Sequence, residues 1–536
     1  MRLCLAARKG KVMQRKTITL LILAAAAAAA LSGCGDYKEL EQKSSKVEYS
    51  GSDVYPVKCD DTLKVWSSTL PGGDITQNPL GSIWQEETGV NVEFIQPMNG
   101  SEEALTILLA SGDLPDILLT NLYNQPGGVK KYVDDEVIIP ITDYMDKFAP
   151  NLKKYLDENK DIDKMSKSDD GEYFSFPFLR GDEKLTVSSG LAVRKDMLDK
   201  AGLDIPETID EWHTVLQAFK SQGVSAPLSY DLLYWEKYAG VFMGAYGTKA
   251  DFYLKDGKVT YGYLEPEFKE GLKTLNQWYS EGLIDKNIVK IADKDANILN
   301  SVTGASCMWA GSGLGKYMNA MKDKNPSFDL EPAPFPVLKK GDTSKFGTKE
   351  FAYNINNNSF ITTSCKNIEL AMRFLDYGYT EKGHMMMNFG KEGESYKMEG
   401  DYPKYTDWIM NNPDGLSISD AIGKYTLAST SGPFVQDVRY IEQYYALPQQ
   451  KTALDVWQSD VYDTHIPMVS LTAEESSRIS SIMNDVETCA DEMIFKFIMG
   501  IEPLDNYDSF INTIKGFGVD EAIQIYSDAV ERYNKR

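Results

Sequence analysis

Hydrophobic and polar positions divide this chain into three parts. An apolar stretch of Leu, Ile and Ala covers residues 17–31, and a polar stretch rich in Lys, Glu, Gln, Ser and Asp covers residues 35–53. The apolar stretch is shorter than the ~20 residues that a membrane-spanning helix requires. The polar stretch contains too little apolar surface to fold, which predicts a flexible tether. From residue 58 onward, strand and helix patterns alternate.

The alternating part predicts an α/β fold. Strand patterns at 63–67, 90–95 and 116–120 enclose helix patterns at 78–88 and 101–112. This order, with its short links, predicts right-handed crossovers and a mainly parallel sheet. The last part, from residue 485, reads as helical with breaks at Gly500, Pro503 and Gly516. Because roughly 500 residues exceed one compact core, we expect two or three lobes.

The N-terminal residues are typical of an exported lipoprotein. Six cations and no acid precede Gly33, and the sequence Leu31-Ser-Gly-Cys34 follows the apolar stretch. This order predicts a signal peptide over residues 1–33, acyl chains on Cys34, and a lipidated flexible tether over 34–57. The protein is then expected on the cell membrane, lipid-anchored at the extracytoplasmic face. The sequence leaves open an uncleaved anchor helix and a translation start at Met13.

Charge and cysteine content narrow the choice of partners. The formal net charge is −23, and removal of the six cations of the predicted signal peptide makes it −29. Such a chain lacks the clustered Lys and Arg that nucleic acid requires, and it disfavours a strongly anionic ligand unless a local basic pocket exists. The four later cysteines are scattered without a Cys-x-x-Cys pair, so we expect no zinc or redox site. Export permits a disulfide, which stays an alternative.

Motifs for catalysis and metal binding are incomplete. The run from Gly311 to Lys316 is followed by Tyr317, where a Walker A loop has Ser or Thr, and is interpreted as a close backbone approach. The three histidines lie in unrelated contexts, and no nucleophile elbow is present. The stretch 157–161 begins like a calcium loop, but Ile162 replaces the required Gly. We therefore expect no cofactor, with a structural calcium as the disfavoured alternative.

Several motifs in a fixed order carry a family resemblance. They are LASGDLPDI (109–117), DGEYFSFPF (170–178), LAVRKDMLDKAGLDIPETIDEW (191–212), PEFKEGLKTLNQWYSEGLID (266–285), GASCMWAGSG (304–313), NSFITTSCKNIELAMRFLDY (358–377) and NFGKEGESY (388–396). Together with the lipobox, they resemble a family 1 extracellular solute-binding lipoprotein of an ABC importer, in the long branch that includes oligosaccharide binders. The resemblance implies a two-lobed type II periplasmic-binding-protein-like fold with a hinge and an interlobe ligand cleft.

The resemblance also implies where the lobes begin and end. By analogy with a maltose-binding member, the chain crosses between lobes near 176–178, near 308–311 and around 388–396. Lobe one is then expected to hold residues 58–176 and 310–390, and lobe two residues 178–308 and 391–536.

Aromatic side chains supply the predicted binding surface. The chain has 31 Tyr and 8 Trp, which combine a flat apolar face, suited to the C–H face of a sugar, with a polar edge. Trp309 falls among small residues at an expected lobe crossing, and several other candidates follow predicted strands, where open α/β sheets bind ligands. The predicted ligand-binding residues are Trp309, Trp235, Trp66, Asn121, Tyr123, Tyr173, Phe176 and Trp408.

These observations predict a non-enzymatic, lipid-anchored receptor for a small polar solute. An oligosaccharide is the preferred ligand, and the permease subunits of an ABC importer are the expected membrane partners. We expect a monomer whose lobes close around the ligand by population shift. A surface glycan hydrolase or lyase is one alternative, because two carboxylates suffice for glycoside hydrolysis and the chain has 79 acidic residues. A non-catalytic glycan adhesin is the other.

Overall fold

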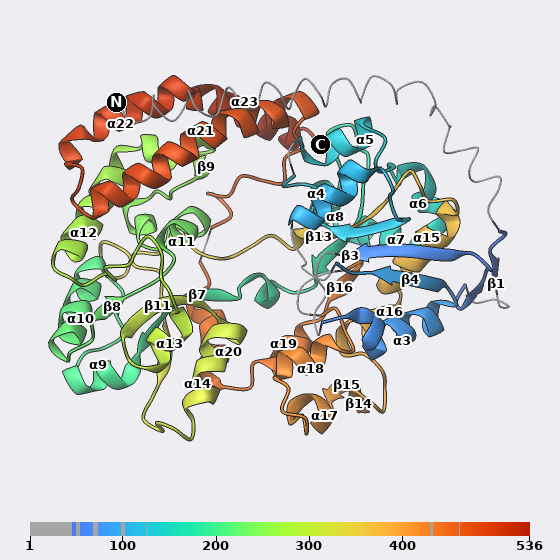
Figure 1. Cartoon of the computed structure of the whole chain (residues 1–536), viewed down its shortest axis with the longest axis horizontal. Helices are drawn as coiled ribbons and strands as arrows, with labels where there is room; N and C mark the ends of the chain where they lie inside the picture. The colour runs from blue at the N-terminus through green and yellow to red at the C-terminus, as the bar shows by residue number, and fades with distance from the viewer. Residues whose placement is uncertain are drawn as a thin grey trace.

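Two β-sheets with helices packed against them form two lobes, which lie side by side in Figure 1. The computed structural model describes residues 45–49, 54–67, 73–97, 102–125, 127–428, 432–459 and 461–536. The predicted signal peptide and the predicted lipidation site Cys34 lie outside these residues. Within the described ranges, no helix is both long and apolar enough to cross a membrane.

Lobe one is built on a six-stranded sheet with the order β16-β6-β13-β5-β3-β4. Strand β3 is parallel to β4 and β5, and helices α3 and α4 connect these strands, which confirms the predicted strand–helix–strand pattern. Strand β13 runs antiparallel between β5 and β6. The elements are β3 (Thr62–Ser67), α3 (Pro79–Thr88), β4 (Asn91–Ile95), α4 (Glu102–Ser111), β5 (Ile117–Thr120), β6 (Phe176–Arg180), β13 (Tyr353–Ile361) and β16 (Phe434–Gln436).

Further helices surround the sheet of lobe one. Helix α15 packs against α6 and α7. Every residue of this helix, Ile368–Asp376, is buried except Glu369. The hairpin β14–β15 and the helices α17 and α18 form the lower edge of this lobe in Figure 1. The elements are α5 (Gly128–Asp134), α6 (Thr142–Phe148), α7 (Pro150–Glu158), α8 (Lys160–Ser166), α15 (Ile368–Asp376), α16 (Glu381–Phe389), β14 (Tyr396–Glu399), β15 (Tyr402–Tyr405), α17 (Asp407–Met410), α18 (Ile418–Gly423) and α19 (Val438–Tyr444).

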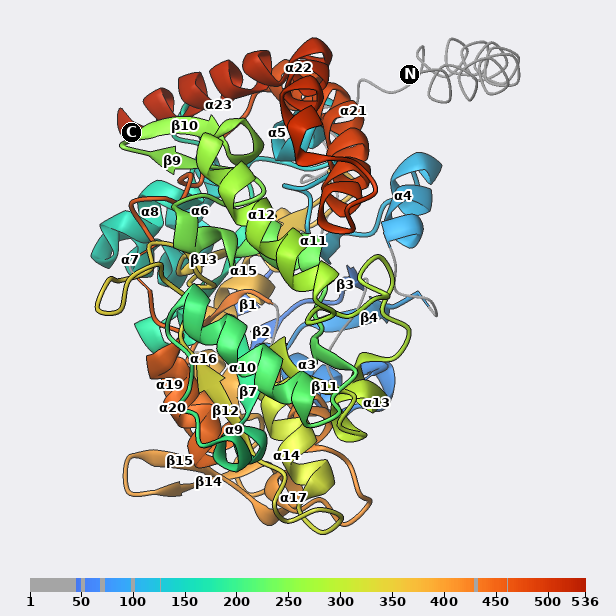
Figure 2. The same ribbon diagram turned by 90° about the vertical axis from the view of Figure 1, so that its left-hand side faces the viewer.

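Lobe two is built on a four-stranded sheet with the order β12-β7-β11-β8. Figure 2, in which this lobe faces the viewer, shows α10 and α12 in front of the sheet. Thr208 and Glu211 form a capping box that starts α10, and Trp212 and Trp278 are buried beneath the two helices. The elements are β7 (Ser189–Arg194), α9 (Lys195–Ala201), α10 (Ile209–Ser221), β8 (Ala226–Leu228), α11 (Leu232–Tyr238), β9 (Phe252–Lys255), β10 (Lys258–Tyr261), α12 (Pro266–Ser280), α13 (Lys294–Leu299), β11 (Thr303–Trp309), α14 (Lys316–Met321), β12 (Leu330–Ala333) and α20 (Pro448–Val456).

The chain passes between the two sheets later than expected at every crossing. Strand β6 belongs to lobe one through its last residue, β12 pairs with β7 in lobe two, and β16 pairs with β6 in lobe one. The chain therefore crosses within residues 181–188, 334–352 and 437–447, and α19, in the last of these stretches, stays with lobe one through its contact with β15. The predicted boundaries are wrong for residues 310–333, which belong to lobe two, and for 178–180, 391–428 and 432–436, which belong to lobe one. The hairpin and helices inserted before β16 displace the last crossing, because they extend lobe one before the chain leaves it.

The last residues before the folded part are more ordered than a tether. Strand β1 (Glu48–Tyr49) pairs with β2 (Val57–Lys58), and the side chain of Val47 is buried in the core of lobe one. The backbone N–H of Ser45 donates to Asp61 over 2.9 Å. The prediction of a flexible tether up to residue 57 is therefore wrong for residues 45–49 and 54–57, because the buried side chain of Val47 and a strand pairing attach them to the lobe.

Three C-terminal helices extend along both lobes, and Figures 1 and 2 show them as the red layer at the top. They are α21 (Ala473–Ile498), α22 (Tyr507–Phe517) and α23 (Val519–Asn534), and Gly518, with φ of 102°, separates the last two. Lys237 of lobe two pairs with Asp491 of α21 at 2.7 Å. At the other end, Arg532 of α23 pairs with Asp169 of lobe one at 2.9 Å. The helical C-terminal part is confirmed, although Gly516 lies inside α22.

Candidate ligand-binding cleft

A cavity of about 460 Å³ lies between the two lobes. Lobe one contributes the ends of β6 and β16, the start of β13 and one face of α19, whereas lobe two contributes the end of β11 and the turn that follows. This volume lies within the range of about 300–1,000 Å³ that is usual for small-molecule sites. Its polar lining side chains are Arg180, Lys184, Ser188, Ser312, Glu350, Asn354, Asn356, Ser419 and Gln436, and its aromatic ones are Phe178, Trp309, Tyr440, Tyr444 and Tyr445.

Trp309 is the last residue of β11, and its ring lies at the wall of the cavity. It is 37% exposed, whereas Trp212 and Trp278 are almost completely buried. Behind it stands Trp235 of α11, which is 5% exposed, with ring centroids 6.0 Å apart and an interplanar angle of 50°. Trp309 therefore lines the cavity as a partly exposed aromatic side chain, and Trp235 packs against it from the core of lobe two.

The glycine run after Trp309 brings the lobes close together. A Cβ atom on Gly311 would lie 2.4 Å from the hydroxyl oxygen of Tyr444, which belongs to α19 in lobe one. Residues 310–315 form a π-helical turn, and Gly311 and Ser312 line the cavity. The predicted close backbone approach at this run is confirmed, because only a residue without a Cβ fits against the tyrosine as it stands.

One ion pair connects the first two crossing segments. Arg180, at the end of β6, donates from Nη2 to Glu350 and from Nη1 to the carbonyl oxygen of Leu185 over 2.6 Å. The hydroxyl group of Tyr238 donates to Glu350 over 2.6 Å. Each charge of the pair therefore has a hydrogen-bond partner inside the protein. The pair lines the cavity next to the connecting segments 181–188 and 334–352.

The remaining cleft groups are mostly uncharged hydrogen-bonding groups. Asn354 and Asn356 lie at the start of β13, where a register shift separates this part of the strand from Ser359. Burial raises the pKa of Tyr440 and Tyr444 above the ordinary value of a phenol, so both hydroxyl groups stay protonated at neutral pH. Neutral amides and phenols can donate to and accept from the hydroxyl groups of a polar solute.

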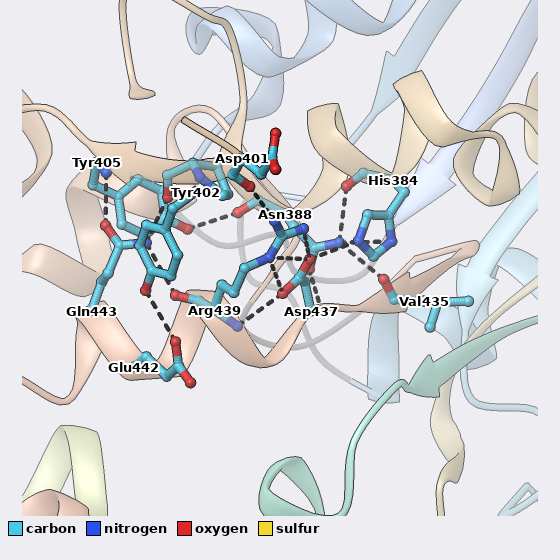
Figure 3. A network of polar contacts seen from close by, with 11 residues as sticks. His384, Asn388, Asp401, Tyr402, Tyr405, Val435, Asp437, Arg439, Glu442 and Gln443 are labelled. Atoms are coloured by element: carbon cyan, nitrogen blue, oxygen red, sulfur yellow. Dashed lines mark hydrogen bonds and ion pairs between the residues drawn. The ribbon is translucent and has the colours of Figure 1, made fainter. Parts of the chain in front are cut away.

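A polar network behind the cleft fixes the start of α19, and Figure 3 shows it. Asp437 accepts from Arg439 at 2.5 Å and lies 2.9 Å from His384 Nε2, while its backbone N–H donates to Asn388 over 2.8 Å. Burial alone raises the pKa of Asp437, but the hydrogen bonds from His384 and Arg439 outweigh it and hold the pKa well below its ordinary value. The network thus holds the helix that carries Tyr440 and Tyr444 into the cleft.

Two of the predicted ligand-binding residues are core residues. Trp66 is 4% exposed and packs in a cluster with Leu118 and Phe360, and Phe176 is fully buried. The prediction of ligand contact is wrong for these two side chains, because both point from their strands into the interior. Trp235 is also buried, although it contacts Trp309.

Four other candidates lie elsewhere in lobe one. The hydroxyl of Tyr173 donates to Asp163 on α8, and Trp408 packs against Tyr425 with ring centroids 5.2 Å apart. Tyr123 accepts from the hydroxyl of Tyr353 over 2.8 Å and lines a second cavity of about 310 Å³ on the other side of β13.

Asn121 lies closer to the cleft than these three. Its side-chain amide donates to Asn356, which lines the cleft, over 3.2 Å. Of the eight predicted side chains, Trp309 is therefore the one that the structure places at the cavity wall, and Asn121 positions a neighbour of that wall.

Strand β13 of the cleft has an unusual sequence, rich in Asn, that a search for aromatic residues does not detect. The stretch Asn354-Ile-Asn-Asn-Asn358 lies in the middle of a strand, although Asn is depleted in strands. Asn358 is buried and accepts from the backbone N–H of Phe178 over 3.3 Å. Such an Asn-rich strand indicates an irregular, polar site, and it could have directed attention to β13.

In the stretch 157–161, which begins like a calcium loop, Asp157 forms ion pairs with lysine side chains. Asp157 pairs with Lys153 and, at 3.3 Å, with Lys160. Across the described ranges, no group of three or more His, Cys, Asp or Glu side chains is placed to hold a metal ion. The four cysteines beyond Cys34 all lie among the described residues, and they form no disulfide there.

Comparison with known proteins identifies the family. The sequence profile of the family described as bacterial extracellular solute-binding protein matches residues 67–385, more than half of the chain. The chain belongs to this family. FusA of Streptococcus pneumoniae, a fructooligosaccharide ABC transporter substrate-binding protein, is 25% identical over 544 residues, which cover 96% of this chain and 97% of FusA. Lipoprotein LipO of Bacillus subtilis is 21% identical over 487 residues, which cover 87% of this chain and 91% of LipO.

Solved structures share the fold over nearly their whole length. The alginate-binding protein AlgQ2 without calcium ion has a TM-score of 0.72 at 22% identity, with 88% of this chain and 98% of AlgQ2 covered. FusA in complex with kestose has a TM-score of 0.70 at 22% identity, with 89% of this chain and 100% of FusA covered. The predicted two-lobed periplasmic-binding-type fold is therefore confirmed.

Proposed function

We propose that this solute-binding protein is a non-enzymatic, lipid-anchored receptor that captures an oligosaccharide and delivers it to an ABC importer. The observation that carries the proposal is the interlobe cavity, which combines the exposed face of Trp309 with neutral amide, hydroxyl and phenol groups from both lobes. An aromatic face suits the C–H face of a sugar ring, and the surrounding polar groups suit its hydroxyl rim. FusA, similar over almost the whole chain, is named for fructooligosaccharides, which supports this ligand class.

The arrangement of the cleft supports capture by lobe closure. Trp309 and Ser312 belong to lobe two, whereas Gln436 and Tyr440 belong to lobe one, so a bound solute contacts both lobes. Contacts to both lobes exist together only in the closed form, and the ligand therefore shifts the population toward closure. A closed receptor presents one defined surface to permease subunits, which are separate chains in this proposal.

The composition of the cleft supports binding without hydrolysis. Among the described residues that line the cleft, Glu350 is the one carboxylate, and Arg180 and Tyr238 hold it. A glycosidase of the usual kind requires two carboxyl groups on either side of the scissile bond. Incubation of oligosaccharides with the protein should leave them intact in a chromatographic assay, and cleavage above the level of a buffer control contradicts this part of the proposal.

The lipid anchor of the proposal depends on Cys34. We expect Cys34→Ala to abolish incorporation of an acyl label and to release the protein from the membrane fraction, because the thiol is the expected acylation site. Immunoblots of fractionated cells measure the release. A variant that keeps both the label and the membrane association contradicts a lipid anchor at this residue.

The ligand itself is tested by direct binding. Purified protein starting at Ser45 is screened by thermal shift against a panel of short fructans, galactosides, glucans and oligogalacturonates, and hits are measured by calorimetry. We expect at least one hit that saturates one site and lowers the radius of gyration in small-angle scattering. The absence of any hit across the panel, with free amino acids or peptides binding instead, contradicts an oligosaccharide ligand.

A further inference from the structure

Two buried polar atoms without a hydrogen-bond partner lie on neighbouring strands at the cleft. Gln436 of β16 is paired in register with Arg180 of β6, the strands are parallel, and both side chains line the cavity. Among the partners that the described residues offer, neither the side-chain oxygen Oε1 of Gln436 nor Nε of Arg180 has a hydrogen bond, although both atoms are buried. The cleft therefore has one unpaired acceptor and one unpaired donor on adjacent strands, at positions that are in register.

The orientation of the Gln436 amide is fixed by its other end. Its Nε2 donates to the backbone carbonyl oxygen of Ala428, so Oε1 is the end of the amide that remains without a partner. The side chain is 4% exposed, and little water reaches it. A ligand that donates to this oxygen gains a hydrogen bond that the free protein does not make, whereas a ligand without a donor gains nothing there.

The charge of Arg180 is already used inside the protein. Nη2 donates to Glu350 and Nη1 to the carbonyl oxygen of Leu185, which leaves Nε as a single donor beside a compensated ion pair. Lys184 is the other cation at the cavity, and it is solvent-exposed at the rim, where its charge is screened. This wall of the cleft therefore has no buried cation free to neutralise an incoming anion.

A hydroxyl group matches this pair of atoms, and a carboxylate does not. A hydroxyl donates one hydrogen bond and accepts others, so it can donate to Gln436 and accept from Arg180. An ionised carboxylate only accepts, which leaves the Gln436 oxygen unpaired against a second acceptor and brings a negative charge toward Glu350.

We infer that the unit bound against β6 and β16 is a neutral, polyhydroxylated sugar, so the protein selects neutral oligosaccharides over those with a carboxylate at this position. This inference rests on the proposed function and specifies its ligand class. Gln436 and Arg180 are the residues that set this selectivity, and Glu350 sets it indirectly because it keeps the Arg180 charge engaged.

The test compares neutral and acidic oligosaccharides of equal length by calorimetry. The neutral probes are kestose, raffinose, stachyose and galactotriose, and the acidic probe for galactotriose is trigalacturonate, which differs by carboxylates at C6. We expect the best neutral probe to bind at least about 10-fold more tightly than any acidic probe, a difference typical of one additional hydrogen bond. Acidic probes that bind as tightly as neutral ones overturn the inference but leave the proposed function standing. If no probe of either kind binds, the proposed function itself fails.

Two variants separate selectivity from folding. Glu350→Gln frees the charge of Arg180 and should raise the affinity ratio of acidic to neutral probes about 10-fold or more. Glu442→Gln makes the same chemical change on α19 at an exposed carboxylate that accepts from Tyr402, so it should leave the ratio within about twofold. An unchanged ratio in Glu350→Gln, with a normal melting curve, overturns the inference.

Gln436→Leu tests the acceptor directly. The change removes the buried oxygen, so the ratio of the affinity for neutral probes to that for acidic probes should fall toward one. The neutral probes should lose the affinity, and the acidic probes should not. A purely structural role of Gln436 weakens neutral and acidic probes by the same factor, and this result overturns the assignment. Where Gln436→Leu does not fold, Glu350→Gln alone decides.

Discussion

Trp309→Ala is the most informative single change, because the structure separates the two roles of this side chain. A buried Trp covers about 150–250 Å², and Trp309 is 37% exposed at the cavity wall, so about 90 Å² of apolar surface is available to a ligand. At about 25 cal/mol per Å², stacking of a sugar on this face contributes about 2 kcal/mol. We therefore expect the Kd to rise about 30-fold.

The same change also removes the contact with Trp235. Since most of the Trp309 surface is covered by the protein, we expect the free energy of unfolding to fall by about 1–3 kcal/mol, below the loss of about 3–5 kcal/mol for a fully buried Trp. For a protein of this size, the melting temperature then drops by a few degrees. Trp309→Phe keeps an aromatic face and should recover part of the affinity.

Calorimetry and a thermal melt on the same preparation distinguish the two contributions. Trp408→Ala is the matched control: this Trp of α17 packs against Tyr425, which follows α18, so its removal should leave the Kd within about twofold. The reasoning is refuted if Trp309→Ala retains wild-type affinity after correction for its folded fraction, or if Trp408→Ala loses as much affinity as Trp309→Ala.

Three further predictions test packing, ionisation and the N-terminal segment. Gly311→Ala places a methyl group against Tyr444 and should weaken ligand binding about 10-fold, because it holds the lobes apart. The double variant Gly311→Ala/Tyr444→Ala should bind the ligand more tightly than Gly311→Ala alone in the same titration. Burial raises the pKa of Glu236 to about 7, above its ordinary 4.5. The protonated carboxyl group therefore stabilises the folded state, by on the order of 3 kcal/mol, fully below pH 4.5. This contribution is lost as the pH rises toward 7 and above. Urea titrations at pH 5 and pH 8 should show a smaller pH difference for Glu236→Gln than for the wild type, and an equal difference contradicts the assignment. Protein starting at Val54 loses buried Val47 and should be about 1–3 kcal/mol less stable in urea than protein starting at Ser45, whereas equal midpoints would show that the segment contributes nothing.

The parts of the fold that follow from local patterns were predictable, and the parts that depend on distant pairing were not. The alternation of strands and helices up to β5 follows from periodicity and caps, and it is confirmed. The lobe assignment of β12 depends on its pairing with β7, more than 130 residues earlier in the chain. No periodicity within residues 330–333 encodes that partner, so the expected return near 308–311 was wrong.

The candidate site was predictable only where one residue was unusual in its own surroundings. Trp309 is a bulky side chain in a run of small ones, and the structure places it at the cavity wall. Trp66 has the same chemistry, but it lies in a strand whose inner face packs against Leu118, and the sequence does not show which face of that strand is covered. The cleft also brings together residues that are far apart in the sequence. Strands β6 and β16 and the segment 334–352 meet at one end of the sheet of lobe one, and they carry Arg180, Gln436 and Glu350.

Specificity and closure share residues in this protein. Arg180 ends β6 directly before the first crossing segment, Glu350 lies near the end of the second, and Gln436 ends β16 directly before the third. In the proposed closure these three segments bend, so a ligand held by these side chains acts directly on the segments that change conformation. A ligand can shift the open–closed equilibrium only by its difference in affinity for the two states. A solute that satisfies Gln436 and Arg180 while it stacks on Trp309 of lobe two gains that difference, whereas a solute that reaches only one lobe binds without closing the protein and is a poor substrate for delivery.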